Sequence, residues 1–191
     1  MGFENINGEQ WFREELYNDV AQSLKVKEKL VEDQSFLDGK KLQDIVIIDT
    51  ERYGKVLILD GIFQTSEKDE IFYHEPLVHF PMFSHPSPKR ILIIGGGDGG
   101  IMREVLKHKI DHVDLVDIDG KVIEYTKKFM PSLPGSAFDD PRAETHVEDG
   151  FKFVARCVKE NIKYDVVIVD SPDPVGPAVS LFSREFYLDI K

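Results

Sequence analysis

Four carboxylates stand where strand-like segments of this sequence end. The segments cover residues 90–97, 112–116, 143–148 and 164–169. The acids that follow them are Asp98, Asp117, Asp149 and Asp170. Between these segments apolar residues recur with helical spacing, so the pattern predicts strand–helix units and a parallel sheet. Ligands of such sheets bind at the carboxyl edge, where the four acids would meet and would favour a cationic ligand over a phosphate-rich one.

The first of these acids lies in a glycine-rich loop. The loop reads Gly95-Gly96-Gly97-Asp98-Gly99-Gly100 after the apolar run at 91–94, and it satisfies the dinucleotide spacing G-x-G-x-x-G. A nicotinamide-dependent enzyme is therefore one hypothesis. Asp98 argues against it, because the pyrophosphate of a dinucleotide lies beside this loop and like charges ~4 Å apart near a surface repel by roughly 4 kcal/mol. Asp98 either caps the next helix or binds an ammonium or sulfonium group, and the three similar acids favour binding.

The next two acids have both a structural and a binding interpretation. Asp117 could cap the helix predicted at 120–130, but Asp119 can do so instead and leave Asp117 to accept hydrogen bonds from ribose hydroxyls. Asp149-Gly150 fits recognition of an adenine amino group with close approach of the ring. It is also an ordinary strand-to-helix turn, and taken by itself the turn is the better interpretation.

A proline-rich loop follows the fourth segment. It reads DSPDPVGP from Asp170 to Pro177, and its prolines bias Ser171 and Asp173 to extended backbone. Asp170 and Asp173 together could hold a cationic amine and accept its proton. A stiff surface turn would explain the prolines but not the two acids.

The composition narrows the classes of partner. The 191 residues carry 24 Lys and Arg against 35 Asp and Glu, for a net charge of -11. Such a chain argues against nucleic acid or an anionic membrane as a partner. No apolar stretch approaches the ~18 residues of a membrane span, and the first residues lack the layout of a secretory signal. With Cys157 as the single cysteine, we expect a cytoplasmic protein without internal disulfides.

Two regions differ in periodicity and predict two domains. From about residue 23 to 65, short apolar runs alternate with turn signals such as Asp38-Gly39 and Asp60-Gly61, which is typical of hairpins. We therefore assign residues 1–66 to a small antiparallel β-hairpin domain. A helix is predicted at 69–83, and the strand–helix alternation makes residues 67–191 a Rossmann-like domain.

These motifs together resemble the polyamine aminopropyltransferases, the family of the spermidine synthases. The longest match is ILIIGGGDGGIMRE at 91–104. Further matches cover residues 11–14, 42–45, 53–54, 59–61, 64–70, 73–75, 140–142 and 170–177. The resemblance implies an α/β fold with a parallel sheet of the S-adenosylmethionine-methyltransferase type, preceded by the antiparallel domain.

The resemblance also implies a reaction. An aminopropyl group would pass from decarboxylated S-adenosylmethionine, the co-substrate, to putrescine, with no metal, no further cofactor and a homodimeric or homotetrameric enzyme. The implied donor-binding residues are Gln43, Asp98, Asp117, Asp149, Gly150 and Pro177, with the loop glycines Gly95, Gly96, Gly97 and Gly99. The implied amine-binding residues are Gln64, Tyr73, His74 and Asp173, and Asp170 would be the base.

Charge and proton balance support two of these roles. The decarboxylated donor lacks the carboxylate of S-adenosylmethionine, so Asp98 would attract the former and repel the latter. The attacking amine must lose a proton, which Asp170 could accept. A zinc site of His74, Glu75 and His79 is not expected, because the histidines are five residues apart and Pro76 intervenes.

Three departures from the family pattern leave alternatives open. Asp117 stands where Glu is more usual, Pro172 replaces a small residue, and the chain stops at Lys191 while relatives continue. We therefore expect a partial chain with an incomplete sheet. The alternatives are a putrescine N-methyltransferase on the same scaffold and a non-catalytic polyamine-binding subunit.

Overall fold

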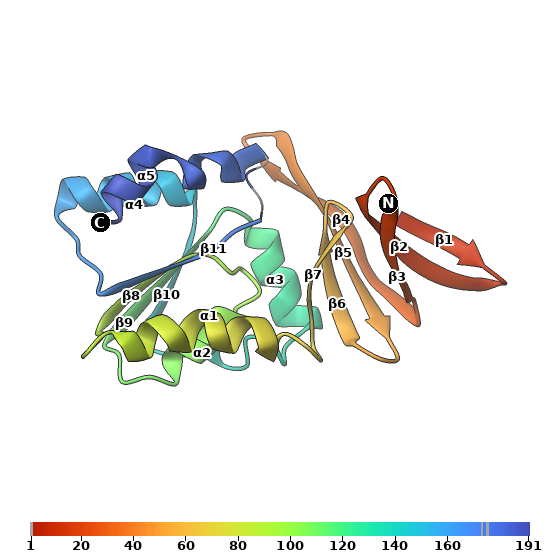
Figure 1. Cartoon of the computed structure of the whole chain (residues 1–191), viewed down its shortest axis with the longest axis horizontal. Coiled ribbons are helices and arrows are strands. Elements are labelled where there is room, and N and C mark those ends of the chain that lie inside the picture. The colour runs from red at the N-terminus through yellow and green to blue at the C-terminus, as the bar shows by residue number, and fades with distance from the viewer. Residues whose placement is uncertain (1, 173, 175) are drawn as a thin grey trace.

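The computed structural model describes residues 2–172, 174 and 176–191. Figure 1 shows a parallel sheet with helices at one end of the molecule and antiparallel strands at the other. Within the described residues, no helix is long and apolar enough to span a membrane.

The N-terminal third forms two antiparallel sheets. The first contains β1 (Gly2–Ile6), β2 (Glu9–Tyr17) and β3 (Val20–Lys25). The second contains β4 (Glu28–Leu37), β5 (Lys40–Thr50), β6 (Gly54–Leu59) and β7 (Ile62–Ser66). Three hairpins turn at Asn7-Gly8, Asp38-Gly39 and Asp60-Gly61, where φ is positive at both residues, as a type I′ turn requires. The predicted antiparallel region is confirmed, although its strands begin at Gly2 rather than near residue 23.

The rest of the chain alternates helices and parallel strands. Its strands are β8 (Arg90–Gly95), β9 (His112–Asp117), β10 (Ala143–Val147) and β11 (Val166–Asp170). Its helices are α1 (Ile71–Ser84), α2 (Gly100–Leu106), α3 (Gly120–Phe129), α4 (Gly150–Glu160) and α5 (Arg184–Asp189), with 3-10 helices η1 (Ala137–Asp139) and η2 (Gly176–Phe182). The four strands pair in parallel, so the predicted Rossmann-like sheet is confirmed. The first strand stops two residues earlier than predicted, because the glycine loop already begins to turn at Gly95.

The strand order β10-β9-β8-β11 decides where a ligand can bind. From β8 the chain adds β9 and β10 on one side, and it then crosses to add β11 on the other side. The carboxyl ends of β8 and β11 therefore flank a topological switch point, which is where open parallel sheets bind ligands. The glycine loop and Asp170 both lie at this point.

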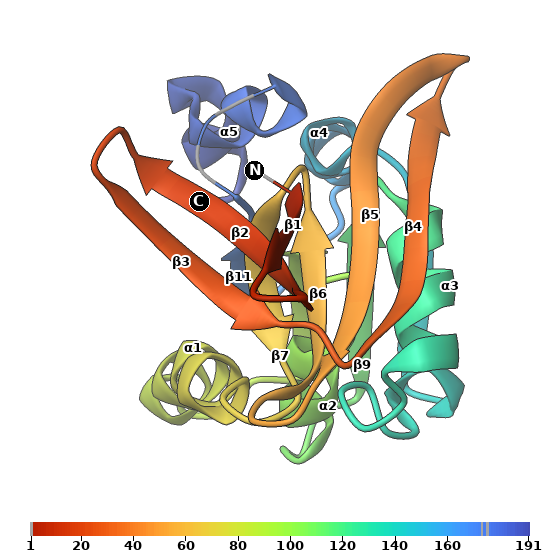
Figure 2. The same ribbon diagram turned by 90° about the vertical axis from the view of Figure 1, so that its right-hand side faces the viewer.

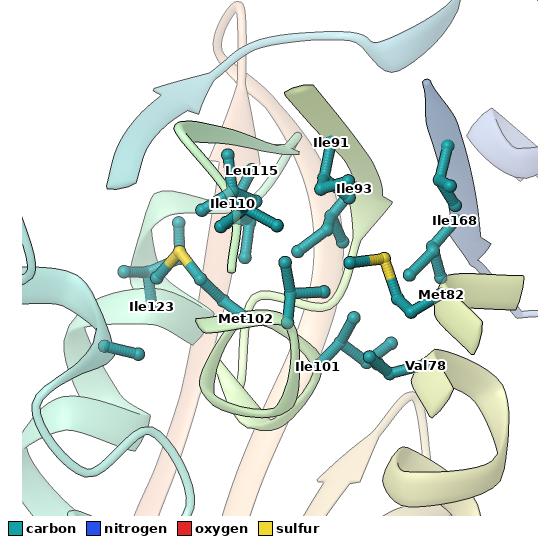
Figure 3. Close-up of a cluster of buried hydrophobic side chains, with 14 residues drawn as sticks. Val78, Met82, Ile91, Ile93, Ile101, Met102, Ile110, Leu115, Ile123 and Ile168 are labelled. Carbon is teal, nitrogen blue, oxygen red and sulfur yellow. The ribbon is translucent and has the colours of Figure 1, made fainter. Parts of the chain in front are cut away.

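Helices cover both faces of the parallel sheet. Figure 1 shows α1 and α2 on one face and α4 and α5 on the other. Buried side chains from α1 and α2, including Val78, Met82 and Ile101, pack against Ile93 and Ile168 of the sheet (Figure 3). Each large aliphatic side chain buried in this way stabilises the fold by about 1.5–3 kcal/mol.

Strand β5 is buried on both faces and joins the two parts of the molecule. Ile45 and Ile47 pack with α3, whereas Val46 and Ile48 pack with Phe12 of β2. In Figure 2 the strands β1–β3 lie in front of β5 and β6, and α3 lies beside β4. The apolar run at 45–48 is continuous, rather than alternating, because successive side chains enter two different cores.

Candidate active site

The glycine loop positions the site because its backbone approaches neighbouring groups closely. Gly95 has φ +83°, and a Cβ there would lie 1.7 Å from the carbonyl oxygen of Asp170. A Cβ on Gly100 would lie 2.3 Å from the imidazole of His74. Glycine is therefore needed at these two positions because residues of the same chain lie close to the loop. In a dinucleotide-binding protein the glycines of this motif instead allow the ligand to approach.

The catalytic candidate Asp170 is the last residue of β11 and contacts α1. Its Oδ1 accepts a 2.5 Å hydrogen bond from the hydroxyl of Tyr73, whose side chain is otherwise about half exposed. Burial and the negative charge of Asp98 raise the pKa of Asp170 to about 6, against the lowering effects of the Tyr73 hydrogen bond and of His74. A carboxylate with a pKa near 6 is ionised at neutral pH and is more basic than an ordinary one.

His74 lies behind this pair with its ring 1% exposed. Its Nδ1 is 2.6 Å from Oε2 of Glu70, and its Nε2 is 3.5 Å from Oδ2 of Asp98. Burial lowers the pKa of His74, but the hydrogen bonds and charges of Asp98 and Glu70 outweigh it and raise the pKa to about 9. His74 is therefore a buried cation between two carboxylates. Its predicted role as an amine-channel residue stays a prediction.

Asp98 lies in the glycine loop, one residue before the N-cap of α2. Its Oδ1 accepts a 2.7 Å hydrogen bond from the N–H of Gly100, but the N-cap of α2 is Gly99, so Asp98 stabilises the turn before the helix rather than capping it. Its Oδ2 faces His74. The side chain is nearly buried at the switch point, and the negative charge of Asp98 also raises the pKa of Tyr73, after burial and Asp170. Its binding role stays a prediction.

Asp117 ends β9 beside the loop. Its Oδ2 accepts from the N–H of Gly97 at 2.8 Å and its Oδ1 from the N–H of Asp119 at 2.8 Å. Burial raises the pKa of Asp117 to about 6, and the charges of Asp119 and Asp170 add to this, whereas the two backbone hydrogen bonds lower it. Asp117 thus makes two contacts within the chain, and its predicted ribose binding stays a prediction.

Asp119 does cap α3, since it accepts a hydrogen bond from the N–H of Lys121 at 2.9 Å. Its Oδ2 also accepts from the hydroxyl of Ser35 and, at 2.6 Å, from Nε2 of Gln43. Gln43 of β5 is therefore held at the loop that follows Asp117. The antiparallel region contributes to this side of the site.

Asp149 occupies the turn into α4. Its Oδ1 accepts a hydrogen bond from the N–H of Phe151 at 2.9 Å. A Cβ on Gly150 would lie 2.6 Å from a side-chain carbon of Ile94, so this helix packs closely on β8. The ordinary-turn interpretation is confirmed, and contact with adenine stays a prediction for both residues.

Of the remaining predicted residues, Gln64 lies away from this group, and the structure does not describe the side chains of the other two. Gln64 is exposed, donates to the carbonyl of Ile62 at 3.2 Å, and lines a separate cavity of about 230 Å³ with Gln22 and Tyr53. Asp173 lies outside the described residues. Pro177 belongs to η2, and its side chain lies outside the described part.

Sequence reasoning missed the residues that fix His74. Glu70 precedes His74 by four residues, which is the spacing of helical neighbours and could have indicated the contact. Arg103 donates to Oε2 of Glu70 at 2.8 Å and holds that carboxylate from α2. No local pattern indicates the second contact, because it joins residues 33 positions apart.

Comparisons with known proteins cover both parts of the chain. Residues 70–191 match the Spermine/spermidine synthase domain, and residues 10–67 match the Spermidine synthase tetramerisation domain. The chain is 48% identical over 183 residues to a polyamine aminopropyltransferase of Bacillus subtilis, covering 95% of the chain and 63% of that protein. It is 50% identical over 181 residues to the one of Methanocaldococcus jannaschii, covering 94% of the chain and 59% of that protein.

Solved structures of spermidine synthases are also similar to this chain. A spermidine synthase in complex with the transition-state analogue AdoDATO superposes with a TM-score of 0.85 at 43% identity, over 94% of this chain and 59% of that one. The spermidine synthase from Thermotoga maritima gives 0.82 at 43% identity, over 94% and 58%. The chain thus spans about 60% of the length of these relatives.

Proposed function

This chain belongs to the spermine/spermidine synthase family, and we propose that it serves an aminopropyltransferase that uses decarboxylated S-adenosylmethionine and putrescine. The products are spermidine and methylthioadenosine. The observation that carries the proposal is the placement of Asp170, its partner Tyr73 and the nearby charge of Asp98 at the switch point of the sheet.

Donor selection rests on Asp98. The aminopropyl arm of the donor ends in an ammonium group, and the same arm of S-adenosylmethionine also carries a carboxylate. A nearly buried acid attracts the ammonium and repels the carboxylate, more strongly than it would in open solvent. Buried His74 fixes the Asp98 side chain from behind and offsets part of its charge.

The acceptor amine is activated at Asp170. One oxygen is oriented by Tyr73, so the carboxylate can receive the proton that the amine must lose before it attacks the carbon next to sulfur. A new C–N bond forms as the C–S bond breaks, and the sulfonium becomes a neutral thioether. No covalent enzyme intermediate is needed, so alignment of amine, carbon and sulfur supplies most of the rate enhancement.

On the nucleoside side we assign the ribose to Asp117 and Gln43 and the adenine to Asp149, Gly150 and Pro177. Asp117 and Gln43 meet through the loop that contains Asp119. The amine channel is assigned to Tyr73, His74 and Asp173, whereas Gln64, expected there from the sequence, lines a separate cavity. The reaction needs no metal and no cofactor besides the co-substrate donor.

We also propose a homo-oligomer, with a homotetramer favoured by the match of residues 10–67 to the tetramerisation domain. The whole protein is assigned to the cytoplasm, with Cys157 as its free buried thiol. Light scattering of the purified protein gives its oligomeric state directly, and a monomer at micromolar concentration would contradict the first proposal.

The decisive assay incubates the protein with putrescine and either donor and identifies products by mass spectrometry. Spermidine and methylthioadenosine from the decarboxylated donor support the proposal. N-methylputrescine from S-adenosylmethionine would identify a methyltransferase instead. Binding of donor and amine without turnover would identify a non-catalytic polyamine-binding subunit.

A further inference from the structure

A second cluster of polar side chains lies on the α4 face of the parallel sheet. His112 and Asp114 come from β9, and Glu144 and His146 come from the edge strand β10. Residues two apart on a strand share a face, and the register pairs Asp114 with Glu144. Asp114 precedes Asp117 by three residues, or about 10 Å along the strand, so the cluster lies away from the candidate active site.

The donor atoms of this cluster converge. Oδ1 of Asp114 is 3.1 Å from Nε2 of His112 and 2.8 Å from Nε2 of His146. The ligand atoms of His112, Asp114 and Glu144 all lie within 4.8 Å of one another, and Nε2 of His146 is 4.0 Å from Oε1 of Glu144. Around a tetrahedral Zn²⁺ with bonds of about 2.0–2.2 Å, neighbouring ligand atoms are roughly 3.3–3.5 Å apart. The atoms of His112, Asp114 and Glu144 are already within about 1.5 Å of that spacing, and His146 is near it with respect to Asp114 and Glu144.

The surroundings orient the ligands. The hydroxyl of Tyr164 donates to Oδ2 of Asp114 at 2.8 Å, and the guanidinium of Arg90 is 3.7 Å from the same oxygen. These contacts leave Oδ1 turned toward the imidazoles. The ring of Phe153 lies 5.0 Å from that of His146 and restricts its rotation. Outer contacts of this kind are typical of protein metal sites.

Burial differs across the cluster in a way that suits metal entry. Asp114 is 4% exposed, the two histidines are partly buried, and Glu144 is exposed at the sheet edge. An ion could thus reach the cluster from solvent and be held against a buried anion. A mixed set of imidazoles and carboxylates matches Zn²⁺ and similar transition metals, whereas Mg²⁺ and Ca²⁺ prefer oxygen ligands alone.

We propose that His112, Asp114 and Glu144 bind a Zn²⁺ ion, with His146 as the fourth ligand. The site lies outside the residues assigned to aminopropyl transfer, so its role is to tie the edge strand β10 to β9. The alternative is that Asp114 simply bridges two imidazoles without a metal.

The test is a Zn²⁺ titration of the untagged, chelator-treated protein by calorimetry, with Co²⁺ absorption as a spectroscopic report on coordination. We expect one ion per chain in the unmodified protein. The double variant H112Q/H146Q should bind at least about tenfold more weakly. The matched control is H79Q/H108Q, which removes two imidazoles outside the cluster whose nearest ring nitrogens are 2.8 Å apart. It should bind Zn²⁺ as the unmodified protein does.

Glu144→Gln provides a second test that does not disturb the core, because the side chain is exposed. It should also weaken Zn²⁺ binding, and it should reduce the rise in melting temperature that Zn²⁺ produces in the unmodified protein. Unchanged binding in both H112Q/H146Q and E144Q, loss of binding in the control alone, or no binding to the unmodified protein would overturn the proposal. If H112Q/H146Q does not fold, E144Q decides.

Discussion

The hydroxyl of Tyr73 donates a 2.5 Å hydrogen bond to Oδ1 of Asp170. Tyr73 belongs to α1, the helix before the parallel sheet, whereas Asp170 is the last residue of β11. The bond therefore connects the helix that precedes the parallel sheet with strand β11 at the switch point. It orients the proposed base and leaves the second carboxylate oxygen for the amine.

Asp170→Asn tests the base directly. The amide keeps nearly the same shape but loses most of the basicity, so turnover should fall by about 10²–10⁴-fold. Donor binding, assigned to Asp98, Asp117 and Asp149, should change little. Steady-state kinetics together with calorimetry separate the two effects. The control is Asp111→Asn, which changes an exposed acid just before β9, at the amino ends of the parallel strands. Near-normal turnover of Asp170→Asn would show that another residue is the base.

Tyr73→Phe should move the acidic limb of the pH–rate profile. The proposed base must be ionised, so the rate should fall as pH drops through the pKa of Asp170, which is about 6. The Tyr73 hydrogen bond lowers that pKa, and its loss should shift the limb to higher pH. The check is kcat/KM measured from pH 5 to 8. If the limb stays in place or moves to lower pH, the Tyr73 hydrogen bond does not lower the pKa of the base.

Asp98→Asn should narrow the preference between donors. The unmodified protein is expected to bind decarboxylated S-adenosylmethionine much more tightly than S-adenosylmethionine. The variant should bind the decarboxylated donor roughly tenfold or more weakly, because a charged hydrogen bond contributes about 1.5–3 kcal/mol. It should tolerate the carboxylate of S-adenosylmethionine better. Calorimetry with both donors decides the matter, and equal affinities in the unmodified protein would rule the idea out.

His74 should make stability depend on pH above neutrality. Its pKa is about 9 in the folded protein and about 6.5 in an unfolded chain, so its stabilising effect is complete below pH 6.5 and is lost as pH rises toward 9. This difference in pKa corresponds to about 3 kcal/mol in the free energy of unfolding. Asp117 and Asp170 have pKa values near 6 and are largely ionised across this window, so they add little slope.

Urea denaturation at pH 6.5 and pH 9 measures this effect. The unmodified protein should lose stability between the two values, and His74→Gln should be less stable at pH 6.5 but nearly independent of pH. His85→Gln, in the segment between α1 and β8, is the matched control and should keep the slope. If His74→Gln still loses stability between pH 6.5 and pH 9, another titrating group causes the pH dependence.

The order of the helices and strands and the residue types of the site loops could be predicted without a structure. Hydrophobic spacing gave the strand–helix alternation, and the glycine pairs gave the hairpin turns, because both depend on neighbours within a few residues. Asp119, one of the two caps that the sequence offered for α3, is the residue that caps this helix, and capping is a local hydrogen bond. The four acids at strand ends led to the prediction of a cationic ligand, which stays a prediction.

The contacts that hold those acids in place could not be predicted, because they depend on how the helices pack. The packing of α1 against α2 brings Arg103 to Glu70 and buries the ring of His74 beside Asp98. The same packing directs Tyr73 to Asp170, while Gln64 remains in a separate cavity. These contacts join residues that are remote in sequence, and their geometry follows from how whole faces of helices and sheets fit together. Local propensity and spacing do not contain that information, because many packings are compatible with the same pattern of strands and helices.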